Sequence, residues 1–129
     1  MQIKLTSIMV TDQEKALKFY IEVLGFQKKT EIPLGKFKWL TVVSPEAPDG
    51  VELVLEPTEF PPAKSYKKAL FEAGIPSASF DVKDIQEEYE RLTKLGVYFK
   101  SGPSSMGPVI VAVLDDTCGN LLQLTQMAK

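Results

Sequence analysis

The stretch that decides the fold is residues 10–26, VTDQEKALKFYIEVLGF, because its main features return at residues 82–97, VKDIQEEYERLTKLGV. In each copy an aspartate, Asp12 or Asp84, precedes a helical pattern, and a glycine, Gly25 or Gly96, follows it. The two copies stay in register to within one residue over their whole length. One pattern used twice in a single chain predicts an internal structural repeat.

Each copy predicts a strand followed by a helix. The apolar strands are expected at residues 5–10 and 78–82, and the helices at residues 13–23 and 85–94, where apolar side chains recur at spacings of three and four. Asp12 and Asp84 suit the N-cap position, since a carboxylate there accepts a hydrogen bond from a free amide of the first turn. Gly25 and Gly96 suit a left-handed residue that ends each helix.

Further strands are predicted at residues 37–43, 51–55, 109–114 and 121–125, and a short helix at residues 63–72 within a linker. The repeating unit is therefore βαβββ. We expect an α+β fold in which two such modules form a curved mixed sheet with a concave cavity and helices on the outer face. The chain is predicted to be a single domain, residues 1–129, with module 1 at 1–58, a linker helix within 59–74 and module 2 at 75–129.

Composition excludes several kinds of partner. The 129 residues carry a net charge of -2 and a pI near 5.2, so neither nucleic acid nor an anionic membrane is expected to bind. No apolar run reaches the length of a spanning helix, and the N-terminus lacks a signal pattern, so a cytoplasmic location is expected. The one cysteine, Cys118, lies in a turn-like stretch and is predicted to be a turn residue.

The chain contains no histidine. Open catalytic sites usually hold divalent transition metals with neutral imidazole and carboxylate together, so the commonest ligand type is missing. We find no glycine-rich phosphate loop, no nucleophile elbow and no plausible catalytic triad. The sequence therefore predicts a fold more clearly than a reaction.

The chain resembles the vicinal oxygen chelate superfamily of glyoxalase I, bleomycin-resistance proteins and extradiol dioxygenases. Four stretches carry the resemblance and cover both modules: residues 10–12, 16–20, 23–26 and 116–124. These stretches are mostly caps, core and turns, so the resemblance is specific for the fold and says little about activity.

The resemblance also implies where metal ligands would lie. The four ligand positions of active members correspond here to Leu5, Glu52, Ser77 and Gln123. Leucine has no donor atom and serine seldom binds a metal, so Glu52 and Gln123 would be short of the three protein ligands of a catalytic zinc-type site. Extradiol dioxygenation, which needs two histidines and a carboxylate, is excluded. We predict no metal and no cofactor.

The two-residue period of strands predicts which side chains share the cavity with these positions. The candidate ligand-binding residues are Leu5, Met9, Phe37, Trp39, Glu56, Ser77, Ser79 and Gln123, with Glu52 as the candidate catalytic residue. Ser7, Val54 and Asp81 face the same way. Apolar and aromatic walls with a few polar groups suit a small-molecule pocket. In the simpler interpretation Glu52 and Glu56 are solvated, the serines fill space, and Trp39 packs in the core.

Two functions from different classes remain. The first is a metal-independent small-molecule binding protein of the bleomycin-resistance type, acting as a homodimer because members of the superfamily commonly pair. The second is a glyoxalase-like lyase or isomerase that uses Glu52 as general base on a carbonyl-containing substrate, with or without a weakly held divalent ion. A protein partner bound at a flat surface around Trp39 is a third possibility.

Overall fold

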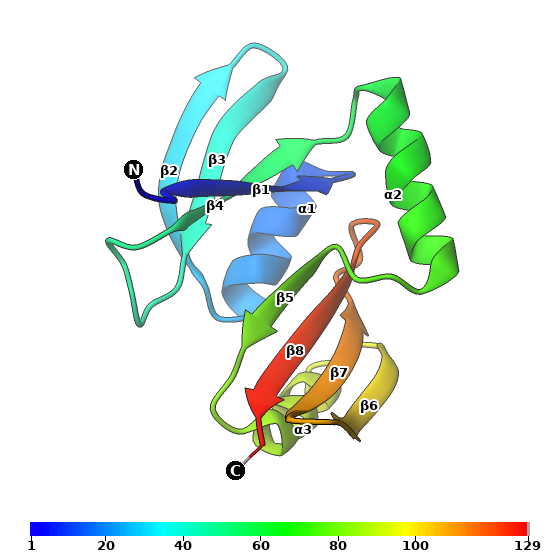
Figure 1. The fold of residues 1–129 in the computed structure, drawn as a ribbon. Coiled ribbons are helices and arrows are strands. Elements are labelled where there is room, and N and C mark those ends of the chain that lie inside the picture. Colours follow the sequence, from blue (N-terminus) through cyan, green and yellow to red (C-terminus); the bar gives the residue numbers. More distant parts are fainter. Residues whose placement is uncertain (129) are drawn as a thin grey trace. The chain divides into compact units, whose positions relative to one another are not determined.

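The computed structural model describes residues 1–128 and divides into two compact units, Met1–Tyr66 and Lys67–Lys129. Each unit contains one four-stranded sheet and its own helix, and each is described separately below (Figure 1). The prediction of an α+β chain built from two βαβββ modules is confirmed. Helix α2, Pro61–Ala73, contains the boundary between the units.

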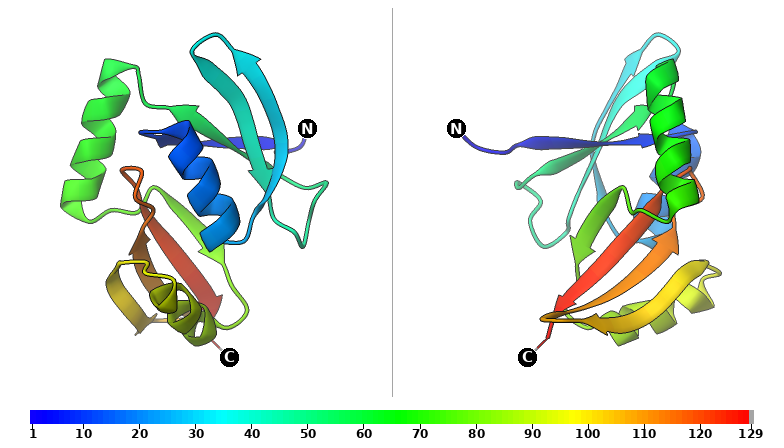
Figure 2. Two further views of the ribbon diagram at one scale, coloured as in Figure 1. Left: turned by 180° about the vertical axis from the view of Figure 1, so that it is seen from behind. Right: turned by 45° about the vertical axis from the view of Figure 1, so that its right-hand side comes forward.

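The first unit contains a mixed sheet with the strand order β1-β4-β3-β2. Its strands are β1 (Leu5–Val10), β2 (Gln27–Leu34), β3 (Phe37–Val43) and β4 (Glu52–Pro57). The pair β1 and β4 is parallel, and the other pairs are antiparallel. Helix α1 (Gln13–Lys18) and the helical segment η1 (Phe19–Val23) follow β1, and α1 lies against one face of the sheet (Figure 2, left).

The second unit repeats this arrangement with the strand order β5-β8-β7-β6. Its strands are β5 (Ala78–Asp81), β6 (Phe99–Met106), β7 (Val109–Asp115) and β8 (Leu121–Met127). The pair β5 and β8 is parallel, as β1 and β4 are in the first unit. Helix α3 (Ile85–Lys94) packs on β6, β7 and β8.

The helix ends form as the repeat predicts. Asp12 accepts a hydrogen bond from the Lys15 amide at 3.1 Å, and Asp84 accepts one from the Glu87 amide at 3.0 Å. Gly25 and Gly96 have φ angles of 91° and 89°, a left-handed conformation that side chains rarely adopt. The paired aspartates and glycines are therefore local signals for where each helix begins and ends.

The helix predicted at residues 13–23 changes character after Lys18. Residues 19–23 form a π-helical turn, in which the Leu24 amide donates to the Phe19 carbonyl at 3.0 Å. Such a turn is wider than an α-helical turn. It accompanies the burial of the adjacent aromatic residues Phe19 and Tyr20. A helical periodicity alone does not distinguish the two kinds of turn.

Strands β2 and β6 had no residue range in the sequence prediction, although the βαβββ unit required them. Both are edge strands, and both lack a clear apolar alternation. Strand β2 contains Pro33, which has no amide to donate, and β6 contains Gly102 and Pro103, in a region where its register with β7 shifts. Proline and glycine in strands are typical of edges and bulges, which explains why the pattern was weak.

The core of each unit lies between its sheet and its helix. In the first unit, alternate strand residues are buried together with α1 and η1 side chains; they are Ile8, Val10, Leu40, Val42 and Leu55. In the second unit Leu114 of β7 and Leu122 of β8 are buried together with Ile85 and Leu92 of α3. Because successive strand residues point to opposite faces, the side chains between these positions lie on the other face of each sheet.

Candidate ligand-binding site

The face of the first sheet opposite α1 contains every candidate site residue of that unit, and we call it the first-unit face. The register places Leu5 beside Glu52, Met9 beside Glu56, and Thr41 beside Val54. Strand β3 adds Phe37 and Trp39 to this face, and β2 adds Ile32 opposite Trp39 and Leu34 opposite Phe37. The face combines two aromatic rings, several aliphatic side chains and two carboxylates.

Glu52 is oriented on this face by a buried hydroxyl. The Thr41 Oγ1 donates to Glu52 Oε1 at 2.7 Å, and Thr41 has no exposed surface. The two residues are on neighbouring strands, two positions apart in register, so the sheet itself fixes their separation. Glu52 is half-buried, and the hydrogen bond from Thr41 holds its carboxylate in one orientation. Thr41 was not among the candidate site residues predicted from the sequence.

The other first-unit candidates differ in exposure. Phe37, Trp39, Met9 and Glu56 are half-buried, and Leu5 is 48% exposed. An apolar molecule that covers these half-buried aromatic rings and exposed aliphatic groups would remove apolar surface from water, which is favourable.

The second-unit candidates lie on the corresponding face of the second sheet. Ser79 and Gln123 are register partners on β5 and β8, and the Gln123 amide donates to the Ser79 hydroxyl at 3.3 Å. The Ser77 hydroxyl donates to the Asn120 side-chain oxygen at 3.1 Å. Both serines are exposed, while Gln123 is half-buried. This face is polar and uncharged at these three positions.

The residues at the four superfamily ligand positions do not fit a metal ion. Leu5 has no donor atom, and one Glu52 oxygen already accepts from Thr41. At the other two positions the Ser77 hydroxyl and the Gln123 amide donate to neighbouring side chains. Within residues 1–128, no group of three or more histidine, cysteine, aspartate or glutamate side chains is placed to hold a metal. We therefore derive no step through a metal.

Charged side chains form a chain of ion pairs in the first unit. The Lys38 Nζ bonds to Glu31 at 2.6 Å and also to Glu14, and Lys28 bonds to Glu31 at 2.7 Å. These hydrogen bonds, from Lys28 and then Lys38, lower the pKa of Glu31 from 4.5 to about 2. The hydrogen bond that Lys38 donates to Glu14, followed by the one that it donates to Glu31, raises the pKa of Lys38. Both groups are charged at neutral pH and tie α1 to β2 and β3.

A buried polar cluster in the second unit was not predicted from the sequence. Lys67 of α2 donates to the Cys118 carbonyl at 3.1 Å and to Asn120 Oδ1 at 2.8 Å. Asp116 is fully buried and accepts hydrogen bonds from the amides of Cys118 and Asn120 and from the Asn120 side chain. Burial lowers the pKa of Lys67, and the nearby Asp116 opposes that shift. Cys118 is buried within this turn.

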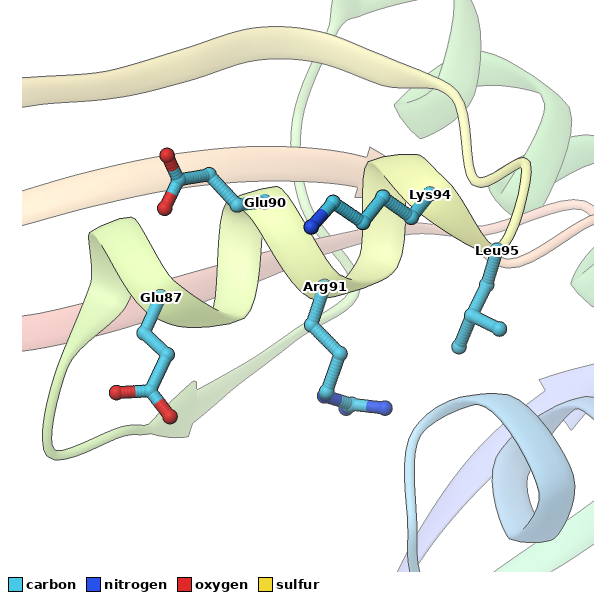
Figure 3. Close-up of a pocket in the computed structure, with 5 residues that line it drawn as sticks. All are labelled: Glu87, Glu90, Arg91, Lys94 and Leu95. Atoms are coloured by element: carbon cyan, nitrogen blue, oxygen red, sulfur yellow. The ribbon is translucent and has the colours of Figure 1, made fainter.

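One surface pocket of the second unit is lined by none of the predicted site residues. This shallow pocket on α3 is lined by Glu87, Glu90, Arg91, Lys94 and Leu95 (Figure 3). Four of these side chains are charged, and Arg91 bonds to Glu88 at 2.8 Å along the same helix. Alternating charges on an exposed helix are typical of a solvated face, so we assign this pocket no function. Within residues 1–128, no helix is long and apolar enough to cross a membrane.

The repeated βαβββ unit defines a class of folds that is used for many different chemistries. The chain matches the model of the Glyoxalase/Bleomycin resistance protein/Dioxygenase superfamily over residues 2–124 and belongs to that superfamily. The resemblance seen in the sequence is thereby confirmed.

Several relatives resemble the chain over almost its whole length. The uncharacterized protein YurT of Bacillus subtilis (strain 168) is 56% identical over 126 residues, which cover 98% of this chain and 99% of that protein. The crystal structure of UcmS2 is 28% identical with a TM-score of 0.83 and 97% coverage of both chains. TnmS3, an antibiotic binding protein from Streptomyces sp. CB03234, is also 28% identical, with a TM-score of 0.79, covering 99% of this chain and 97% of that one.

Proposed function

We propose that this chain is a metal-independent small-molecule binding protein of the bleomycin-resistance-like type. The observation that carries the proposal is the first-unit face, where half-buried Trp39 and Phe37 share a surface with the Glu52 carboxylate oriented by Thr41. An aromatic surface with one fixed acceptor suits a ligand that combines a flat apolar part with a hydrogen-bond donor or a positive charge. The likeness to TnmS3, an antibiotic binding protein, supports the same function.

The donor chemistry supports binding without a metal. Of the four superfamily ligand positions, Leu5 has no donor atom, and the groups at Glu52, Ser77 and Gln123 are engaged with neighbouring side chains. A ligand on the first-unit face therefore has Glu52 as a hydrogen-bond acceptor rather than a coordinated ion as its polar contact.

Titration calorimetry tests this proposal, with metal-free bleomycin and a panel of planar aromatic antibiotics as probes. We expect at least one compound to bind, with affinity unchanged by EDTA. Trp39→Ala should weaken binding by about tenfold or more, because buried aromatic residues commonly dominate binding energy. Tyr98→Ala is the matched control, since Tyr98 is a 67% exposed aromatic residue of the second unit. Affinity that EDTA abolishes and zinc restores, or that Trp39→Ala leaves intact, contradicts the proposal.

The fixed direction of Glu52 also favours the second candidate function, a lyase or isomerase with Glu52 as general base. A base must be held within hydrogen-bond reach of the proton it removes, and Thr41 holds this carboxylate in place. Glu52→Gln separates the two functions in assays with carbonyl-containing substrates. Loss of turnover with retained affinity supports the enzyme, whereas loss of affinity in a protein without turnover supports the binding protein.

We also propose that the chain acts as a homodimer. Support comes from exposed apolar side chains on the first-unit face, where Leu5, Ile32 and Leu34 are each about half exposed. Burying such groups against a second copy removes apolar surface from water. Light scattering after size-exclusion chromatography measures the mass directly. A monomeric mass at high protein concentration overturns this part of the proposal.

A further inference from the structure

The antiparallel pairing of β3 and β4 ends early, next to the aromatic residues of the first-unit face. The register pairs are Thr41 with Val54 and Val42 with Leu53. If the pairing of β3 with β4 continued in the same register, Trp39 would lie opposite Glu56. The described part of the chain contains no such pair. Figure 1 shows the two strands diverging beyond these pairs. The part of β3 that holds Phe37 and Trp39 is therefore not paired with β4.

The side chain of Gln13 occupies the place of the missing pairs. Its Nε2 donates to the Lys38 carbonyl and to the Leu55 carbonyl, each at 2.8 Å. Its Oε1 accepts from the Lys38 amide at 3.0 Å. One amide side chain from the first turn of α1 therefore satisfies both main-chain groups of Lys38 and one carbonyl of β4. Gln13 is itself only 9% exposed, so these bonds are shielded from water.

The bonded residue, Lys38, stands between the two aromatic residues in the chain. On its other side β3 pairs with the edge strand β2, where Pro33 is the partner of Lys38 and has no amide to donate. A cavity of about 280 Å³ lies where the strands have separated, and Gln13, Phe37, Lys38 and Pro57 are among its lining residues. The direction of this part of β3 thus depends on Gln13 in addition to its pairing with β2.

We propose that Gln13 is a positioning residue, which fixes the Phe37–Trp39 segment of β3 and with it the aromatic part of the first-unit face. The side chain replaces the strand pairing with a bridge of fixed length and so sets how far β3 stands from β4. The proposal concerns the same surface as the proposed function, and rests on that function only for the effect on ligand affinity.

The only tryptophan of the chain, Trp39, reports on this segment without any ligand. The experiment measures Trp39 emission and acrylamide quenching in the full chain, with Gln13→Met and Gln13→Glu as variants. Methionine keeps the length of the side chain and removes every polar group. Glutamate keeps an acceptor for the Lys38 amide and loses the two donors. We expect the quenching constant to rise by about twofold in Gln13→Met, because a segment without its bonds opens to solvent more often.

Gln126→Met is the matched control, because the Gln126 side chain accepts a hydrogen bond from the Ile85 amide at 2.7 Å in the second unit. This variant should lower the unfolding midpoint and leave the emission and the acrylamide quenching of Trp39 unchanged. A folded Gln13→Met with wild-type Trp39 emission and quenching overturns the proposal. If Gln13→Met does not fold, Gln13→Glu tests the proposal instead: a folded Gln13→Glu with wild-type Trp39 emission and quenching overturns it.

Ligand binding is a separate readout. For any antibiotic that binds the wild type, we expect Gln13→Met to weaken binding by about tenfold, the effect of a small misplacement of a main contact. A changed Trp39 signal supports the positioning role even where none of the compounds binds the wild type. Failure of the proposed function and failure of this inference are therefore distinguishable.

Discussion

Replacing Lys67 by methionine removes the one cation of the buried polar cluster in the second unit. Lys67 is 7% exposed, and its ammonium group donates to the Cys118 carbonyl and to Asn120 Oδ1 at 3.1 and 2.8 Å. The variant keeps most of the apolar stem of the side chain. It leaves two buried oxygen atoms without these donors and the buried Asp116 without its nearby cation.

The expected loss of stability follows from opposing terms. A hydrogen bond from a charged group contributes about 1.5–3 kcal/mol, and removing one partner of a buried charged cluster costs about 3–5 kcal/mol. The wild type already bears the cost of burying the ammonium group, as the lowered pKa of Lys67 indicates. We therefore expect Lys67→Met to reduce the free energy of unfolding by about 2–4 kcal/mol.

Urea unfolding followed by circular dichroism measures this change, and hydrogen exchange locates it. Lys68→Met is the matched control, since Lys68 is exposed on the same helix and faces Glu72 at 3.7 Å. Exposed pairs of this kind contribute about 0.3–0.5 kcal/mol. Exchange should accelerate in the turn that contains Cys118 and in the second half of α2. Equal midpoints for the two variants refute the reasoning.

Two smaller changes test the first unit. The pKa of Glu31 is lowered from 4.5 to about 2, so its bonds to two lysines stabilise the fold above pH 4.5, and this contribution is lost as the pH falls toward 2. In Glu31→Gln, Tm should therefore decrease less steeply over that pH range than in the wild type. Scanning calorimetry measures this, and equal slopes for the variant and the wild type contradict the prediction. Thr41→Val removes the hydroxyl that binds Glu52 at nearly constant volume, and should cost about 1–2 kcal/mol in urea unfolding. Thr30→Val, on the neighbouring strand, should cost clearly less; equal losses would show that the bond to Glu52 contributes nothing.

Local signals in the sequence were sufficient for the repeat and for the sheet faces. Asp12 and Gly25 determine the ends of a helix through groups within a few residues of them, so a short pattern contains the information. The alternation in β4 likewise placed Glu52 on the face opposite the helix because the period of a strand is two. These predictions concern single elements, and each depends on nearby residues only.

The hydrogen bonds that determine the geometry of the first-unit face and of the buried polar cluster join residues far apart in the chain. Gln13 and Leu55 are 42 residues apart, and Lys67 and Asn120 are 53 apart. A glutamine at the start of a helix and a lysine in a linker helix both have the usual appearance of solvated residues. Their burial depends on which strand passes beside them, and a single sequence contains no local signal for that. The π-helical turn of η1 and the edge strand β2 were missed for the related reason that their patterns are weak.

The position of Lys67 has a consequence for how the chain divides into halves. The sequence repeat places the second module at residues 75–129, but the compact unit begins at Lys67, in the middle of α2. A fragment that starts at the repeat would lack the lysine that binds Asn120 and would retain the buried Asp116. The duplicated sequence module is therefore shorter than the compact unit that contains both Asp116 and its cationic neighbour Lys67. A half-protein intended to fold alone must include the linker helix from a residue before Lys67.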